Sequence, residues 1–495
     1  MSSEIPIPVL QDYGLTGKTG FLPGEFPVTE LSDPYYGKWE SVVRILPSLL
    51  LSKRIRMVVD KLPQLEVKPS LLENTAQLRR AYSVLCFIAN AYVWGYDEPL
   101  DTLPDCIAQP LLLISERLGL PPLATYASLI LWNYQPIIHD SDLVEDIFDL
   151  QNLTTINTFT GGIDESWFYL VSVFFEKNGG QCIDAGLQAI QATRERDSKK
   201  LRSLLENMAQ GIDQLGSLLM KMEEMCDPHV FYYRIRPYLA GWKNMADAGL
   251  PNGVKYGPNG SYHHFAGGSN AQSSLIQALD ILLGVEHFAM GHKKPQQEAI
   301  SAKTASNSFI NGMREYMPRE HRTFLVHLEQ VSTIRDYVLS HKSDEKLTLA
   351  YDACLGMLKS FRDKHIQIVS RYVILQANKK PLSGSKSKTY RSGLSKGQGK
   401  KEQTGTGGTS LIPFLKQCRD ETGSVAASDW GKKMLSTGVL QVQSSSSIVG
   451  IRKRPTDDEK LGEIGERKRT KVGLAGDWKS ADDDDEIVSR STGHW

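Results

Sequence analysis

The sequence predicts an all-α protein with a small N-terminal helical domain, a larger C-terminal helical domain and a disordered C-terminal tail. Apolar residues recur at helical spacing in most segments between Trp39 and Ala377. Several of these segments begin or end with residues that favour helix termini, such as Asp227-Pro228 and Gly119. Because 495 residues exceed what one hydrophobic core usually serves, we expect two folded units.

The composition narrows the class of protein. The formal net charge is +0, so the overall charge does not favour binding to nucleic acid or to a membrane surface. The six cysteines are widely spaced without a CxxC pair, which indicates reduced thiols rather than a disulfide framework or a zinc site. The N-terminus lacks the pattern of a signal peptide, and no apolar run reaches membrane-spanning length. These features predict a soluble, cytoplasmic protein.

The first part of the chain divides into an arm and the small domain. Residues 1–34 are rich in Pro and Gly, and we expect them to lie as an extended arm on the surface of the first domain. That domain spans residues 35–150. An apolar stripe over 78–92 predicts a buried helix at its centre, and a shorter helix at Pro122–Trp132 carries Tyr126.

The large domain, residues 151–377, is expected to begin with a deeply buried helix at Glu165–Lys177, ended by Gly179-Gly180. On this helix Phe168 and Ser172 are four residues apart and share a face. The simplest interpretation of such a pair is core packing, with the hydroxyl bonded back to its own helix.

The longest predicted helix follows, at about Ala185–Met225. Its leucines and methionines alternate steps of four and three residues, which is a heptad seam. A seam of this length suits packing inside a helical bundle, so we interpret this helix as scaffold.

The segment after Asp227-Pro228 holds an arginine among aromatic residues. Pro237 cannot donate to the helix ladder, so the helix should bend or stop at Arg236. An arginine at such a break can direct its guanidinium into a cavity, with Phe231 about a turn and a half earlier. It can also lie on the surface with its stem packed on the rings, and the pattern alone favours the surface.

The stretch Tyr351–Ala377 reads as one long amphipathic helix with His365 in the middle of its apolar stripe. Such a histidine is either a core residue with one satisfied hydrogen bond or a ligand to a metal or haem iron. The pattern alone favours the core residue, because no second metal-binding side chain stands one turn away on the same face. A lone imidazole is too little for zinc, but it is what a five-coordinate haem requires.

The composition changes abruptly after Ala377. Residues 378–404 are rich in Lys, Ser and Gly and predict a mobile basic loop. Residues 405–422 combine a Gly-rich turn with a short apolar helix, which we interpret as a segment that closes over a site. Residues 423–495 show no packable pattern and predict a disordered tail that is dispensable for chemistry.

Two basic clusters in this tail, at 452–454 and 467–469, have the spacing of a bipartite nuclear-import signal. A solvated tail without that function explains the same residues, and it is the favoured interpretation.

Several runs of sequence, taken together, carry a family resemblance. In their order and separation they resemble the indoleamine 2,3-dioxygenase family of tryptophan-oxidising haem enzymes, with the look of a fungal member: PPLATY, RPYLAGWK, FAGGSNAQSS, YMPREHR and FRDKHIQIVSRY. The match extends from about residue 10 to 422. It implies one haem b per chain, enclosed between two helical domains. It also implies that both atoms of dioxygen enter the indole ring of L-tryptophan to give N-formylkynurenine, the first step of the kynurenine pathway towards NAD.

The resemblance also implies roles for individual residues. His365 matches the proximal haem ligand, and Asp280 and Arg362 match a pair that braces the proximal side. Arg236 matches the arginine that holds the substrate carboxylate. The remaining matches belong to the substrate pocket and its closing segment: Tyr126, Phe168, Ser172, Phe231, Ser269 and Thr406. No residue is implied to act as acid or base, since the haem iron carries the chemistry.

Asn270 departs from the family pattern, because several members carry alanine there. The expected partners are L-tryptophan, dioxygen and a cellular reductant, and the expected state is a monomer. Two other classes remain open: a haem protein of the same fold that is a sensor or acts on another indole, and a helical scaffold without cofactor.

Overall fold

The structure is a computed structural model that describes residues 5–288, 308–378, 405, 411–436, 472–473 and 476–477. Residues 1–441 form one compact unit. In the second unit, residues 442–495, the described residues form the antiparallel strand pair β6 (Val472–Gly473) and β7 (Gly476–Asp477). All other elements belong to the first unit, which is mostly helical, as predicted.

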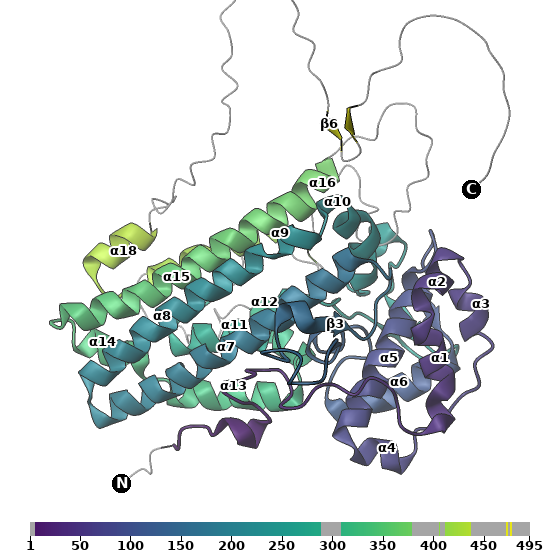
Figure 1. Cartoon of the computed structure of the whole chain (residues 1–495), viewed down its shortest axis with the longest axis horizontal. Coiled ribbons are helices and arrows are strands. Elements are labelled where there is room, and N and C mark those ends of the chain that lie inside the picture. Colours follow the sequence, from purple (N-terminus) through teal and green to yellow (C-terminus); the bar gives the residue numbers. More distant parts are fainter. Residues whose placement is uncertain are drawn as a thin grey trace, which may run out of the picture. The chain divides into compact units, whose positions relative to one another are not determined.

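The N-terminal helices surround one long, buried helix, α5 (Thr75–Trp94). Every residue of α5 from Arg80 onwards is buried, because the sequence there is apolar on nearly all sides. Asn74 caps its start by accepting a hydrogen bond from the backbone N–H of Gln77. The helices that pack on α5 are α1 (Gly37–Arg44), α2 (Leu46–Leu51), α3 (Ile55–Val59), α4 (Pro69–Glu73) and α6 (Asp105–Leu118). Figure 1 shows them gathered around α5, which confirms the predicted buried helix.

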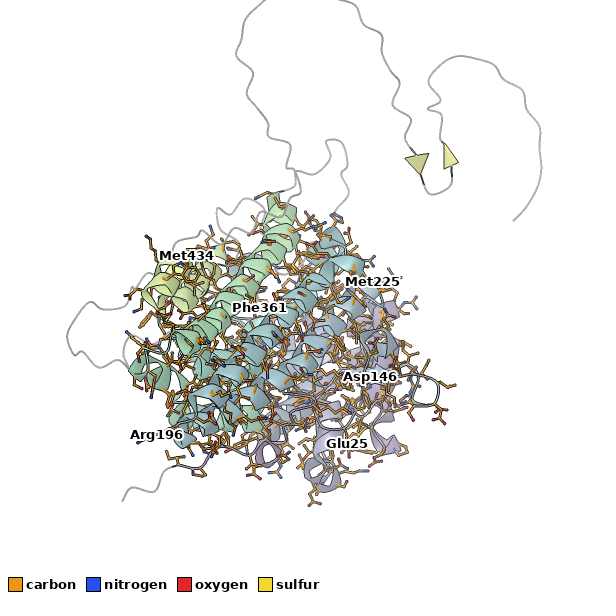
Figure 2. The ribbon with its side chains drawn as sticks, turned by 60° about the vertical axis from the view of Figure 1, so that its left-hand side comes forward. Glu25, Asp146, Arg196, Met225, Phe361 and Met434 are labelled. Carbon is orange, nitrogen blue, oxygen red and sulfur yellow. The ribbon has the colours of Figure 1, made fainter. Side chains whose placement is uncertain are left out.

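Three long helices run side by side in the rest of the unit: α7 (Ile163–Glu195), α8 (Ser198–Met220) and α15 (Glu345–Val369) (Figure 1). α8 packs against both of the others through the predicted seam. Its members Leu201, Leu205, Met208, Ile212 and Leu215 are at most 1% exposed. Figure 2 shows Arg196, directly after the end of α7, at one end of this bundle and Met225 at the opposite end.

Shorter helices complete this part: α9 (Met222–Met225), α10 (Pro228–Val230), α11 (Ser274–Leu282), α12 (Ser308–Met313), α13 (Arg319–Val331) and α14 (Ile334–Ser340). α15 continues through the π-helical turn Ser370–Ile374 into α16 (Leu375–Asn378), so the predicted helix of Tyr351–Ala377 is confirmed. Within the described ranges, no helix combines the length and the apolar character needed to cross a bilayer.

Two predicted boundaries in the bundle were wrong. α7 continues through Gly179-Gly180 because these glycines serve close packing rather than a helix stop. A Cβ on Gly179 would lie 2.0 Å from Leu275 Cδ2. The chain turns instead at Arg196, which has a left-handed φ of 56°. Asp197 then caps α8 by accepting a hydrogen bond from Lys200 N at 2.9 Å, so Ala185–Met225 is not one helix.

The N-terminal arm contacts both parts of the unit. The rings of Tyr13 and Phe21 pack on Phe324 of α13, with centroids 5.5 and 5.8 Å away. Phe26 packs on Tyr134 and Phe148, which lie within residues 35–150. The prediction that the whole arm lies on the first domain was therefore wrong for the part from Tyr13 to Phe21.

Short strands interrupt the helices. β1 (Thr102–Leu103) pairs in parallel with β4 (Val254–Tyr256), which pairs antiparallel with β5 (Tyr262–His263). β2 (Tyr134–Pro136) pairs antiparallel with β3 (Leu153–Thr155). The apolar core consists of two clusters, and one of them contains residues from Leu22 to Val373, so it spans both predicted domains. The domain boundaries at 35–150 and 151–377 remain predictions.

Packed helical structure continues beyond residue 423, where the composition predicted that the tail begins. α17 (Leu411–Ser424) is followed by α18 (Asp429–Ser436), and Val425, Ala427 and Leu435 are buried. Asp352 of α15 accepts hydrogen bonds from the backbone N–H groups of Ala427 and Ser428 at 2.6 and 3.1 Å. The predicted start of the disordered tail at 423 was thus too early. The loop from 379 to 404, Thr406 and both basic clusters lie outside the described residues.

Candidate functional site

One cavity collects nearly all of the predicted site residues. Its walls leave about 1930 Å³ of unfilled space, counting the part open to solvent, and about 270 Å³ of it can be reached by the centre of a water molecule. Nine of the ten predicted residues line it: Tyr126, Phe168, Ser172, Phe231, Arg236, Ser269, Asp280, Arg362 and His365. The tenth, Thr406, is not described, although its neighbour Gly405 lines the cavity.

His365 faces the cavity from α15, where it is partly buried. Burial, together with the nearby charge of Arg362, lowers the pKa of His365 to about 4, so the imidazole is neutral at neutral pH. No hydrogen bond joins its ring to any described residue, in contrast to the satisfied core histidine that the pattern alone favoured. A neutral imidazole without a protein partner offers a nitrogen lone pair to a metal in the cavity.

Arg362 stands one helical turn before His365 and forms a buried ion pair with Asp280 of α11. Its Nη1 also donates to the backbone oxygen of Cys418 at 2.9 Å, so the pair is tied to α17. Burial alone would raise the pKa of Asp280, but Arg362 and His287 outweigh that effect and hold the pKa below its usual value. The two charges therefore stabilise each other beside the face that carries His365.

Arg236 lies where the π-helical turn Phe231–Ile235 changes to the 3-10 turn Arg236–Leu239, which is the predicted break before Pro237. Only 3% of this residue is exposed, so the surface interpretation was wrong. Its guanidinium lies over the ring of Tyr232, 5.4 Å from the centroid. Burial lowers the pKa of Arg236 to about 10, which leaves it charged at neutral pH. The cavity thus holds a buried cation.

Aromatic rings form the wall between α7 and the π-helical turns. Phe168 and Phe231 meet edge to face with centroids 5.0 Å apart, and Phe231 meets Tyr372 in the same way at 5.7 Å. Ser172 donates its hydroxyl hydrogen bond to the backbone oxygen of Phe168 at 3.2 Å, as the simplest interpretation predicted. It lines the cavity as well, so the bond to its own helix does not remove it from the site.

The loop before α11 is held against the chain that follows Arg236. A Cβ on Gly267 would lie 2.1 Å from the backbone oxygen of Leu239, so only glycine fits there. The backbone N–H of Trp242 donates to the oxygen of Phe265 at 2.8 Å. Ser269 caps the short 3-10 turn that follows and accepts from Ala271 N at 3.2 Å. This close approach brings Ser269 and Arg236 to the same cavity.

The sequence reasoning missed Glu176, which is fully buried in α7. Its Oε1 accepts hydrogen bonds from the hydroxyls of Tyr126 and Ser273 at 2.9 and 2.6 Å. Burial raises the pKa of Glu176 to about 7 despite these two donors. One signal was available, since Glu176 is an acid four residues after Ser172, at the end of the mostly apolar run 167–175. It fixes Tyr126 from behind the cavity wall.

The arrangement defines what the site can do chemically. A neutral imidazole suits an iron or another metal ion on one wall, and a buried guanidinium suits a carboxylate. The aromatic wall suits a flat, apolar group of a ligand. Together they describe a pocket for a metal-containing cofactor and an aromatic acid.

Comparison with known proteins points to one family. The family model described as Indoleamine 2,3-dioxygenase matches residues 9–425. An indoleamine 2,3-dioxygenase from Saccharomyces cerevisiae is 49% identical over 433 residues, which cover 85% of this chain and 94% of the yeast protein. Indoleamine 2,3-dioxygenase 1 from Mus musculus is 34% identical over 418 residues, covering 84% of this chain and 95% of the mouse protein. A Fusarium equiseti protein named 6-hydroxytryptophan 2,3-dioxygenase is 34% identical over 419 residues, covering 83% and 96%.

Proposed function

This chain belongs to the indoleamine 2,3-dioxygenase family, and from that premise we propose that it inserts both atoms of dioxygen into the indole ring of L-tryptophan to give N-formylkynurenine. One observation carries the proposal. A neutral His365 without a hydrogen-bond partner among the described residues and a buried, charged Arg236 line the same cavity. A cofactor-free scaffold gains nothing from that combination, because each group carries a burial cost.

The residues fit haem b. His365 would bind the haem iron, since its ring has no competing hydrogen bond to a described residue and its lowered pKa keeps protons from competing with iron. The apolar wall of Phe168, Phe231 and Tyr372 suits the face of a porphyrin or an indole. When bound, haem would supply the dioxygen chemistry, and the protein would supply position and electrostatics.

Arg236 would bind the carboxylate of the substrate. A guanidinium forms two parallel hydrogen bonds with a carboxylate, and the low exposure of Arg236 strengthens that pairing. Ser269 and the segment around Thr406 would then cover the amino-acid end of the substrate. The Arg362–Asp280 pair would hold α15 and α11 in position behind His365.

A second substrate class has specific support. The Fusarium equiseti relative is named for 6-hydroxytryptophan, and this chain carries Ser172 on an otherwise apolar stretch of the cavity wall. A ring hydroxyl needs a polar partner when it is buried, and Ser172 offers one. L-tryptophan remains the first candidate, because the relatives named indoleamine 2,3-dioxygenase include the one that is 49% identical. We also propose that a cellular reductant supports the reaction, that the protein is a monomer and that it is cytoplasmic.

The decisive test supplies L-tryptophan and dioxygen to the haem-loaded protein under reducing conditions. We expect N-formylkynurenine as the product. A separate reaction with 6-hydroxytryptophan tests the second substrate class. Ratios of kcat/KM rank the two indoles. If haem binds but neither indole is consumed, the alternative of a haem protein without turnover on these substrates replaces the proposal.

A further inference from the structure

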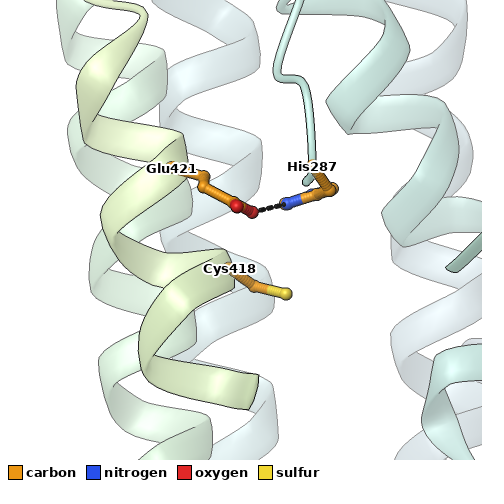
Figure 3. A group of neighbouring side chains, drawn as sticks. All are labelled: His287, Cys418 and Glu421. Carbon is orange, nitrogen blue, oxygen red and sulfur yellow. Dashed lines mark hydrogen bonds and ion pairs between the residues drawn. The ribbon is translucent and has the colours of Figure 1, made fainter. Parts of the chain in front are cut away.

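Beside the Arg362–Asp280 pair, three metal-binding side chains of different chemistry meet. Cys418 and Glu421 stand three residues apart on α17, and His287 reaches them from the chain after α11 (Figure 3). One ligand atom from each lies within 4.8 Å of the other two. Glu421 Oε2 is 2.6 Å from His287 Nδ1. None of the three has a part in the proposed oxidation of an indole.

We propose that His287, Cys418 and Glu421 bind a Zn²⁺ ion through Nδ1, Sγ and Oε2, with a fourth position open to water. Thiolate, imidazole and carboxylate are the three ligand types that zinc takes in proteins. Bond lengths of about 2.0–2.3 Å and tetrahedral angles place such ligand atoms about 3.3–3.8 Å apart. The ligand atoms would therefore move by about 1 Å on zinc binding, which side-chain rotation can supply. The widest separation in the cluster would shorten, and the 2.6 Å between His287 Nδ1 and Glu421 Oε2 would lengthen.

The surroundings of the cluster already orient two of the ligands. His287 Nε2 lies 3.1 Å from Asp280 Oδ2, so a proton on Nε2 leaves Nδ1 to face the cluster. This is the arrangement of a carboxylate, a histidine and a zinc ion in which the carboxylate fixes the histidine tautomer. Glu421 Oε1 accepts from Gln417 Nε2 at 2.7 Å and from Phe288 N at 3.1 Å, which leaves Oε2 for the metal.

The charge balance of the cluster also suits a divalent ion. Without metal, His287 Nδ1 and Nε2 each face a carboxylate oxygen, of Glu421 and Asp280, so each ring nitrogen shares a proton with a carboxylate, and Cys418 is a free cysteine. Binding Zn²⁺ would displace one proton from Nδ1 and one from the thiol. Two positive charges leave and two enter, so the buried region keeps its net charge, which avoids the cost of an uncompensated ion.

The position of the cluster shows how an ion could reach it and which segments a bound ion would join. His287 and Cys418 line the cavity, so an ion can enter from it. A bound ion would join α17 to the chain after α11 and would fix Asp280 through His287. The site does not depend on the proposed function, because none of its ligands is a residue proposed to bind the substrate or the haem iron.

The test measures zinc and iron per chain in the haem-loaded protein after dialysis against buffered zinc sulfate. We expect one zinc per chain that a strong chelator removes, together with undiminished iron. Cys418→Ala and Glu421→Gln should each weaken zinc binding by at least the roughly 10- to 100-fold that loss of an outer-sphere partner costs. The matched control is Cys106→Ala, since Cys106 is also a buried free cysteine but packs in the N-terminal helices.

Two outcomes would overturn the site: wild-type protein that retains no zinc, or a Cys418→Ala variant that binds zinc as tightly as the wild type. Unfolding curves recorded in chelator show whether each variant is folded. If Cys418→Ala does not fold, the Glu421→Gln variant carries the test. Because zinc and iron are measured in the same sample, loss of haem binding is distinguishable from loss of zinc binding.

Discussion

Arg362 Nη2 lies 2.7 Å from both carboxylate oxygens of Asp280, and both side chains are about nine-tenths buried. The pair joins α15, one turn before His365, to α11. Removing one partner of a buried ion pair leaves a charge without compensation, which costs far more than the pair itself contributes.

Asp280→Asn is therefore expected to lower the free energy of unfolding by about 3–5 kcal/mol. Haem retention should fall with it, because α15 loses its anchor behind His365. Urea unfolding monitored by circular dichroism measures the first effect, and Soret absorbance per chain measures the second. Asp363→Asn is the matched control: Asp363 pairs with Arg419 between α15 and α17, but that pair is partly exposed and should contribute only about 0–1 kcal/mol.

The raised pKa of Glu176 predicts that the stability of the protein depends on pH. Its folded pKa of about 7 exceeds the usual value near 4.5, so the folded state resists ionisation of this carboxyl. The free energy of unfolding of the wild type, measured relative to that of Glu176→Gln, should fall by an amount on the order of 3 kcal/mol as the pH rises from about 4.5 to 7. Above about pH 7 the difference should stay constant.

Urea unfolding of both proteins at several pH values gives the difference. Glu195→Gln on the same helix is the control, because the pKa of exposed Glu195 is lowered by Gln191 and Lys200 and its trend has the opposite sign. A difference between wild type and Glu176→Gln that does not change with pH would show that Glu176 titrates normally.

Arg236→Lys should raise KM for L-tryptophan about tenfold or more, although the positive charge is kept. An ammonium cannot reproduce the two parallel hydrogen bonds of a guanidinium, and 1.4 kcal/mol of lost binding corresponds to one factor of ten. Steady-state kinetics measure the change. The control is Arg234→Lys, two residues away on an exposed position, which should leave KM unchanged. If the KM of Arg236→Lys equals that of Arg234→Lys and of the wild type, Arg236 does not bind the substrate.

Truncation separates the packed residues after α17 from the rest of the tail. Ending the chain after Ser436 should leave stability unchanged. Ending it after Gly423 removes buried Val425 and Leu435 and the two backbone donors to Asp352, which should cost about 3 kcal/mol or more. Thermal unfolding of the two truncated proteins provides the comparison. Equal melting temperatures would mean that α18 contributes nothing to the fold.

The sequence predicted those parts of the fold that follow from local patterns. The seam of α8, the buried helix α5 and the break at Arg236-Pro237 each depend on spacing or on proline chemistry within one segment, and all three are confirmed. The stop predicted at Gly179-Gly180 failed because these glycines are needed by Leu275, which lies far away in the sequence. A glycine that permits close packing looks the same in sequence as one that ends a helix.

Local sequence patterns also predicted only part of the candidate site. Periodicity placed His365 on an apolar face, but it favoured a core residue, and only the family resemblance pointed to a ligand. Burial of Arg236 also depends on distant segments, since the loop at Gly267 closes against Leu239. The packing of residues 425–435 was missed because its main anchor, Asp352, belongs to another helix. Contacts between remote segments decide each of these cases, and composition does not encode them.

The visible absorption spectrum of His365→Ala tests the central claim most directly. No other described residue is proposed to hold the iron, so the account predicts a variant that folds but retains no haem and shows no Soret band after reconstitution. His139→Ala, which changes an exposed histidine that does not line the cavity, should bind haem like the wild type. A His365→Ala protein with full haem content and an unchanged ferrous spectrum would contradict the assignment of the ligand.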